Sequence, residues 1–424
     1  MQNFIPDYLA DVLSACAEDT SGHVADYIPE LAKADPDRQA LAIVTADGSA
    51  YSSGEDGHEF TIQSISKPFI YALAIDDRGM ERVLESVGVE PSGEAFNELS
   101  LEGGTGRPLN PMINAGAIAT HQLLSTEGYA PLEDGAPEHR SRSDTVKART
   151  ARVLADLSAF AGRELSVDYA VADSEYNDAY RNLAIANMLR TYDIISAYPT
   201  EAVRGYIDQC AVLVTVTDIA MMAATLANNG IQPVTGERIV SAGAARQALS
   251  IMATCGMYDA SGAWLSQIGI PAKSGVSGGI IGILPGQVGI ASFSPRLDRR
   301  GNSVRGVEMF QRLSQDMGLH LMINEQHSST AVRGMRTVDD DGEPTTSVRL
   351  QGTLRFSGAE RALRAITEAR EEGELEHRVL FDYSRVEQVS RVGRTMMREL
   401  RRRLEGDGLT VVDYDPEGLL SGSS

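Results

Sequence analysis

The chain has 424 residues, of which 42% are hydrophobic and 23% are charged, and its formal net charge is −21 at pH 7. This length predicts two or three domains, and the composition is typical of folded rather than disordered proteins. The acidic balance argues against nucleic acid or an anionic membrane as the main partner, because both repel negative charge.

The chain begins without the features of an exported or membrane protein. MQNFIPDYLADVL has neither the basic nor the apolar region of a secretory signal, and no run approaches the roughly 20 apolar residues of a membrane span. Three cysteines without a CxxC pair predict no disulfide framework. We therefore expect a cytoplasmic protein with no membrane association.

The N-terminal three quarters of the chain mixes strand and helix patterns. Residues 40–54 predict a hairpin around Asp47-Gly48, and residues 58–77 pass from a short strand into a helix. Residues 278–295 predict paired strands. Further stretches have apolar positions at helical spacing, namely residues 144–162, 180–196 and 214–230, the last starting near Thr217 or Asp218 and ending at Gly230. This mixture predicts an α+β fold with one sheet and a helical body.

The composition changes near residue 330. Residues 337–347 are acidic and turn-forming, and strand patterns then alternate with helix patterns, at residues 348–356, 357–373, 377–384, 390–408 and 409–414. Ser357 and Glu360 form a capping box at the start of the first of these helices. This order predicts a small α/β domain with some parallel strand pairing, so we divide the chain into residues 1–328 and 329–424.

Ser64 and Lys67 lie three residues apart in FTIQSISKPF, residues 60–69. Pro68 is tolerated only in the first turn of a helix, so the helix should begin near Ser64, with Lys67 on the same face. There the helix dipole favours a developing oxyanion, and a neutral, desolvated lysine can take the hydroxyl proton. The alternative is a capping serine followed by a surface lysine.

A second lysine motif, Lys273-Ser274-Gly275, has the form of the strand that borders Ser-Lys active sites. The glycine allows close approach of substrate to backbone, so the Val276 N–H is a candidate oxyanion donor. A bulged edge strand is the alternative. Lysine occurs only at positions 33, 67, 147 and 273. Two of these four lie in the two motifs of the same mechanism, one in each, which argues against coincidence.

Both motifs and their neighbours resemble the glutaminase family, which shares the serine β-lactamase-like fold. The match spans about residues 10–325, and its segments follow in the expected order: GHVADYIPELA (22–32), RPLNPMINAGAI (107–118), SEYNDAYRN (174–182), YIDQCAVLV (206–214), GMYDASGAW (256–264) and FSPRLDRRGNSVRG (293–306). The resemblance implies an antiparallel sheet with a helical body, as in β-lactamases and penicillin-binding proteins.

The resemblance also implies hydrolysis of L-glutamine to L-glutamate and ammonia. Ser64 would attack the side-chain amide, Lys67 would be its base, and Tyr258 would be the second acid/base. The N–H groups of Ser64 and Val276 would form the oxyanion hole. Tyr27 would lie on a mobile stretch that closes over the substrate.

Further positions match those that hold glutamine in the family, namely Asn114, Glu175, Asn182 and Tyr206, in addition to Ser64, Tyr258 and Val276. Glutamine asks for such a set, because its α-ammonium needs a carboxylate and its α-carboxylate needs donors. The seven histidines have no ligand spacing and no phosphate loop is present, so we expect no metal and no cofactor. The family usually forms dimers or tetramers.

Residues from about 330 resemble a STAS domain, through VRLQGTLRFSGAE and HRVLFDYSRVEQVSRVGRTMMREL. The signature Asp-Ser-Ser/Thr-Gly of that family aligns with Ser390-Arg391-Val392-Gly393, where the Asp is missing and Arg391 replaces the phosphoacceptor. A docking or oligomerisation role with a protein partner is therefore favoured over phosphorylation, with Ser390 as a displaced acceptor as the alternative. Two other functions stay open: a penicillin-binding or β-lactam-hydrolysing enzyme, and a glutamine sensor that signals through the STAS-like domain without turnover.

Overall fold

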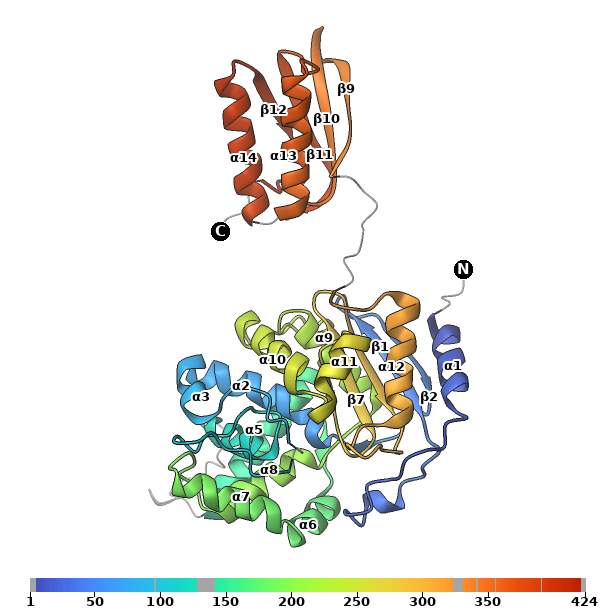
Figure 1. Ribbon diagram of the computed structural model, residues 1–424, viewed down its shortest axis with the longest axis vertical. Coiled ribbons are helices and arrows are strands. Elements are labelled where there is room, and N and C mark those ends of the chain that lie inside the picture. The colour runs from blue at the N-terminus through green and yellow to red at the C-terminus, as the bar shows by residue number, and fades with distance from the viewer. Residues whose placement is uncertain are drawn as a thin grey trace. The chain divides into compact units, whose positions relative to one another are not determined.

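The computed structural model describes residues 5–94, 97–127, 142–322, 331–340, 342–354, 356–389 and 391–420 (Figure 1). The chain divides into two compact units, Met1–Ile323 and Asn324–Ser424. The boundary predicted at 328/329 falls outside the described residues.

The first unit is built on a five-stranded antiparallel sheet with the strand order β2-β1-β8-β7-β6. Its strands are β1 (Ala40–Thr45), β2 (Ala50–Gly54), β6 (Ala272–Ser274), β7 (Gly279–Leu284) and β8 (Val288–Phe293). The predicted hairpin and paired strands are both confirmed. Because β1 pairs with β8, with Ala40 opposite Phe293, the two ends of this unit meet in one sheet.

Both faces of the sheet are covered by helices, so β7 and β8 are buried throughout rather than alternating between buried and exposed residues. α9 (Val216–Ala227) packs along one face, and α1 (Ile5–Cys16) with α12 (Val304–Met317) lies on the other (Figure 1). The approach of α9 is close at Gly289, where a Cβ atom would lie 2.2 Å from the Ala224 nitrogen and 2.5 Å from the Ala220 oxygen. Glycine at this position therefore allows the helix backbone to touch the strand.

The helical body follows the short strand β3 (Phe60–Thr61), which pairs with β5 (Val212–Val214), itself paired with β4 (Ser166–Val167). The remaining described helices of this unit are α2 (Lys67–Arg78), α3 (Met80–Ser86), α4 (Asn114–Leu123), α5 (Arg142–Ala161), α6 (Tyr169–Asn177), α7 (Tyr180–Thr191), α8 (Pro199–Cys210), α10 (Ala242–Cys255) and α11 (Ser261–Gln267). The predicted helices are confirmed as α5, α7 and α9. The α+β class is thereby confirmed.

The predicted start of α9, near Thr217 or Asp218, is two or three residues too late. Thr215 is the N-cap, and its hydroxyl accepts a hydrogen bond from the Asp218 N–H at 3.2 Å. The Asp218 carboxylate in turn accepts from the Thr215 N–H at 2.7 Å. The pair forms a capping box, which places Asp218 at the third helical position rather than at the cap.

The second unit contains a four-stranded sheet with the order β12-β11-β10-β9. Its elements are β9 (Val332–Asp340), β10 (Glu343–Leu354), α13 (Phe356–Glu371), β11 (Arg378–Val389), α14 (Arg391–Gly406) and β12 (Thr410–Tyr414). The predicted alternation and parallel pairing are confirmed, since β10, β11 and β12 run parallel. The identity of this unit as a STAS-like domain stays a prediction.

The interpretation of residues 337–347 as a turn-forming stretch is wrong for most of its length. β9 and β10 form an antiparallel hairpin there. Arg378 explains why acidic residues are tolerated in these strands, because its guanidinium pairs with Asp340 at 2.9 Å and Glu343 at 3.4 Å. Ser390 and the side chains of Ser357, Glu360 and Arg391 lie outside the described part of the chain.

Within the described ranges, no helix combines the length and the apolar character needed to cross a bilayer.

The close contact between Gly289 and α9 leads to a prediction about the stability of the first unit. We expect Gly289→Ala to lower the free energy of unfolding by about 2 kcal/mol or more, because the added methyl must push α9 away from β8. Trp264, the chain's single tryptophan, is buried in this unit, so its fluorescence during denaturation reports the change. Gly243→Ala, at an exposed position in α10 with only a 3.8 Å contact, is the matched control and should be neutral or stabilising. Equal unfolding midpoints for the two variants would contradict the packing argument.

Candidate active site

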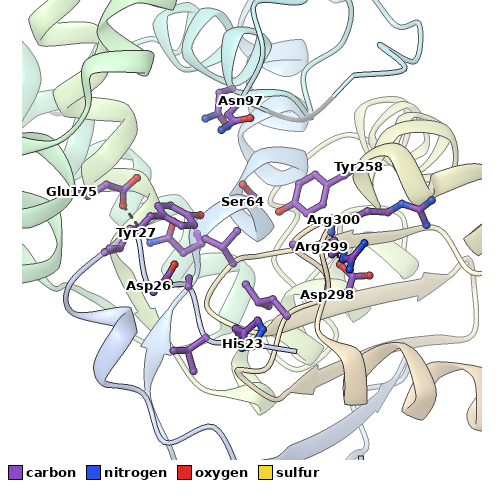
Figure 2. Close-up of a pocket in the computed structure, with 18 of the residues that line it drawn as sticks. His23, Asp26, Tyr27, Ser64, Asn97, Glu175, Tyr258, Asp298, Arg299 and Arg300 are labelled. Atoms are coloured by element: carbon purple, nitrogen blue, oxygen red, sulfur yellow. Dashed lines mark hydrogen bonds between the residues drawn. The ribbon is translucent and has the colours of Figure 1, made fainter. Parts of the chain in front are cut away.

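One cavity of about 760 Å³ collects nearly all the site residues predicted from the sequence. Those among its lining residues are Tyr27, Ser64, Asn114, Glu175, Asn182, Tyr206, Tyr258 and Val276. Lys67 is not among them, because it lies below the cavity floor with 1% of its surface exposed. In Figure 2, Tyr258 lies on one side of Ser64, and Tyr27 and Glu175 lie on the other.

Ser64 lies in a 3₁₀ turn, Gln63–Ser66, that leads directly into α2. The Lys67 N–H donates to the Ser64 carbonyl, and Pro68 occupies the first turn of α2. The predicted helix start near Ser64 is confirmed, although its first turn is 3₁₀ rather than α. Gln63 has a φ of +50°, a conformation rarely adopted by a residue with a side chain.

The motif Lys273-Ser274-Gly275 packs directly against this turn. A Cβ at Gly275 would lie 3.1 Å from the Ile65 side chain and 3.2 Å from the Ile62 carbonyl. Glycine therefore lets β6 approach Ser64 closely enough for the Val276 backbone to line the same cavity.

Lys67 is held by oxygen atoms from a different part of the chain. Its Nζ donates to the Met112 carbonyl at 3.1 Å and to Asn114 Oδ1 at 2.8 Å. Burial lowers the pKa of Lys67 to about 8, although the charge of Glu175 favours the protonated form. A lysine with this pKa is neutral for much of the time in mildly basic solution, and it can then accept a proton.

Tyr258 is fixed by β6 and by its own turn. Its hydroxyl donates to the Ser274 carbonyl at 3.0 Å, while Ser261 Oγ donates to the Tyr258 carbonyl at 2.8 Å. Its φ of +55° is unusual for an aromatic residue. Burial raises the pKa of Tyr258 above its usual range, against hydrogen bonding with Ser64, which lowers it. The phenol is therefore a proton donor at neutral pH.

Lys273 takes part in the site more directly than the motif alone predicted. Its Nζ lies 4.2 Å from the centroid of the Tyr258 ring and donates to the Ser274 carbonyl at 2.7 Å. It is fully buried, and burial together with the charge of Lys67 lowers its pKa well below the usual value. Lys273 and Tyr258 therefore share one carbonyl acceptor.

A polar network connects the residues predicted to hold the substrate. The Tyr206 hydroxyl donates to Asn114 Oδ1 at 3.2 Å, and Asn114 Nδ2 donates to Asn182 Oδ1 at 3.0 Å. Gln63 Nε2 donates to Glu175 Oε2 at 3.3 Å. Burial raises the pKa of Glu175 to about 7, against Gln63 and Lys67, which lower it. The sequence analysis missed Gln63, whose only local signal is its place beside Ser64.

Two segments form the mouth of the cavity. Tyr27, with 58% of its surface exposed, belongs to lining residues 21–28, and residues 297–301 meet that segment at His23 and lie across the cavity from Tyr27 (Figure 2). Arg300 in the second segment pairs with Asp259 at 3.4 Å, which connects the mouth to the residue that follows Tyr258. The sequence analysis also missed Asn97, Asp178, Arg181 and Arg299 in the lining, all of them exposed or half-buried polar residues without a local pattern.

Among the described residues, no group of three or more His, Cys, Asp or Glu side chains could hold a metal ion.

Comparison with known proteins identifies the family. Residues 22–322 match the model of the Glutaminase family. The chain belongs to the glutaminase family. Glutaminases of Corynebacterium efficiens and Corynebacterium glutamicum are 50% and 49% identical to it over 98% of this chain, covering 93% and 95% of their own lengths. The crystal structure of Mglu covers 99% of this chain and 100% of its own, with a TM-score of 0.83 and 47% identity. The β-lactamase-like fold expected from the sequence is the fold of this family.

In this glutaminase family member, buried polar groups support the turn that carries Ser64. Ser66 Oγ donates to the Gln63 carbonyl at 2.8 Å and accepts from Gln209 Nε2 at 2.9 Å. Gln209 Oε1 lies 2.8 Å from His121 Nδ1, and burial lowers the pKa of His121 to about 3, so the ring is neutral and donates. This chain of hydrogen bonds holds Gln63 in its unusual conformation.

Ser66→Ala should therefore destabilise the first unit by about 1–3 kcal/mol, because it leaves the Gln209 amide buried without its acceptor. The unfolding midpoint followed by Trp264 fluorescence measures the loss. Ser250→Ala removes only an exposed bond from Ser250 Oγ to the Arg246 carbonyl and is the control. A midpoint for Ser66→Ala equal to that of the control would show that the turn does not depend on this support.

Proposed function

We propose that this chain hydrolyses L-glutamine to L-glutamate and ammonia, with Ser64 as the nucleophile. The observation that carries the proposal is Ser64 on the cavity wall, one turn before a buried lysine of lowered pKa, Lys67, and hydrogen-bonded to a buried tyrosine, Tyr258. The Corynebacterium relatives are glutaminases, and Mglu has been crystallised in a glutamate form. Both support glutamine as the substrate.

In the acylation half of the reaction, neutral Lys67 takes the Ser64 proton while Oγ bonds to the amide carbon. The N–H groups of Ser64 and Val276 stabilise the oxyanion. The proton then reaches the leaving nitrogen through Tyr258, the C–N bond breaks, and ammonia leaves the glutamyl-enzyme. In the second half, water adds to the acyl carbon, its proton returns to Ser64 Oγ, and glutamate is released.

Substrate selection follows from the charges of a free amino acid. Glu175 accepts the α-ammonium, and Gln63 orients the carboxylate by its hydrogen bond of 3.3 Å. Asn182 and Tyr206 supply donors for the α-carboxylate, for which the Tyr206 hydroxyl turns away from Asn114 Oδ1, its acceptor in this structure. An amide that lacks either charged group leaves buried partners unpaired, which disfavours it strongly.

For the second unit we propose docking or oligomerisation through a STAS-like fold, and not a part in the chemistry. The described residues that line the cavity fall between Ser21 and Val304. A homodimer or homotetramer and a cytoplasmic location remain expectations from the sequence. The sensor and penicillin-binding hypotheses gain no support, since the relatives compared above are glutaminases.

A coupled ammonia assay tests the proposed function. Ser64→Ala and Lys67→Ala should each lower kcat by roughly a thousandfold or more, because they remove the nucleophile and its base. Lys147→Ala, an exposed position on α5, is the control and should keep wild-type activity. A chain without residues 331–424 should still release ammonia. The proposal fails if the wild type releases none at millimolar glutamine, or if Ser64→Ala remains active.

The two shifted pKa values predict the pH dependence of kcat/KM. Glu175 must be ionised to bind the α-ammonium, and this form dominates above a pKa of about 7. Lys67 must be neutral to act as a base, and this form dominates above a pKa of about 8. Both requirements raise kcat/KM as pH increases, so the profile from ammonia release should climb from pH 6 to a plateau near pH 9.

Glu175→Gln is expected to remove the lower of the two transitions and to raise KM. A wild-type profile that is flat or falls between pH 6 and pH 8 would contradict this assignment.

A further inference from the structure

The segment that carries Tyr27 connects α1, which ends at Cys16, to β1, which begins at Ala40. Between them, the only regular helix or strand is a 3₁₀ turn, Leu31–Lys33. Segments of this kind open at low free-energy cost unless other contacts hold them. We call residues 17–37 the Tyr27 flap.

Arg305, in the first turn of α12, holds both ends of the Tyr27 flap. At the N-terminal end its Nε donates to the Asp19 carbonyl at 2.7 Å and its Nη2 to the Ala17 carbonyl at 2.9 Å. At the C-terminal end its Nη1 donates to the Asp37 carbonyl at 3.1 Å and its Nη2 to Asp37 Oδ1 at 3.2 Å. The residue is 2% exposed, so these partners replace its contacts with water.

Arg296 makes a second connection between the same two ends. Its Nη1 donates to the Thr20 carbonyl at 2.9 Å and its Nη2 to Asp37 Oδ1 at 3.1 Å. The Asp37 carboxylate therefore accepts from both arginines. A backbone bridge between His23 and Leu297, with N–O distances of 3.0 and 2.8 Å, lies on the cavity side of these contacts.

We infer that Arg305, Arg296 and Asp37 are positioning residues that fix the pivot of the Tyr27 flap. With both ends held at one point, movement is confined to the middle of the segment, where Tyr27 lies at the cavity mouth. Only a planar guanidinium offers enough fixed donors for several carbonyls and a carboxylate, so lysine cannot replace Arg305. Tyr27 then returns to the same place over Ser64 in each closure, which retains the substrate and excludes water.

The inference rests on the proposed function, and two variants test it in the full-length chain. Arg305→Lys keeps the charge and loses the fork of donors, while Asp37→Asn weakens the acceptor at an exposed site. Both should raise KM for L-glutamine about fivefold or more, because a loose flap holds the substrate less well. Arg312→Lys, on the same helix α12, is the control: Arg312 bonds Glu308 and Cys16, neither of which lies in the flap, and the variant should match the wild type.

Limited digestion with trypsin reports the flap directly. Lys33 is exposed within the flap, and cleavage after it should be faster in Arg305→Lys and Asp37→Asn at temperatures where Trp264 fluorescence shows the unit folded. L-glutamate should protect Lys33 in the wild type and less so in the two variants.

The inference is overturned if Lys33 cleavage and KM are unchanged in both variants. It is also overturned if a rise in KM appears only with a lowered Trp264 unfolding midpoint. The digestion without ligand does not require turnover, so a wild type that releases no ammonia would refute the proposed function while the flap pivot remains measurable.

Discussion

The whole site depends on the burial of Lys67. Removing an ammonium from water is costly unless partners replace the water, and the lysine otherwise becomes neutral. Nζ donates to the Met112 carbonyl and to Asn114 Oδ1, and neither of these acceptors carries a full charge. Burial outweighs the charge of Glu175, which favours the protonated form, and lowers the pKa of Lys67 to about 8. The fold thus makes a candidate base by burying this side chain.

The same constraint shapes the other side of Ser64. Lys273 is buried beneath Tyr258, and the two share the Ser274 carbonyl as their acceptor. The charge of Lys67 disfavours the charged form of Lys273. Lys273 lies near Lys67 because the segment that follows β6 packs against the turn that carries Ser64, and the absence of a side chain at Gly275 permits this packing. The close packing at this glycine therefore contributes to the lowered pKa of Lys273.

Local patterns predicted the parts of the site that are made by neighbours in sequence. The spacing of Ser64, Lys67 and Pro68 predicted a helix start, and it is confirmed. The positive φ angle of Gln63 was not predicted, because the Ser66 hydroxyl that bonds the Gln63 carbonyl is itself held by Gln209, 143 positions away. The contact between Arg305 and Asp37 at the pivot of the Tyr27 flap could not be predicted either, because the two residues lie 268 positions apart in the sequence.

Recognition and catalysis cannot be separated in this arrangement. The charge of Glu175 favours the protonated form of Lys67. In the proposed mechanism, a substrate ammonium placed against Glu175 would offset that charge, so binding of glutamine would shift Lys67 toward the neutral form that removes the Ser64 proton. An amide without an α-ammonium would leave the charge of Glu175 in place and Lys67 more fully protonated. The cavity would then select against such amides twice, by weaker binding and by a smaller fraction of neutral Lys67.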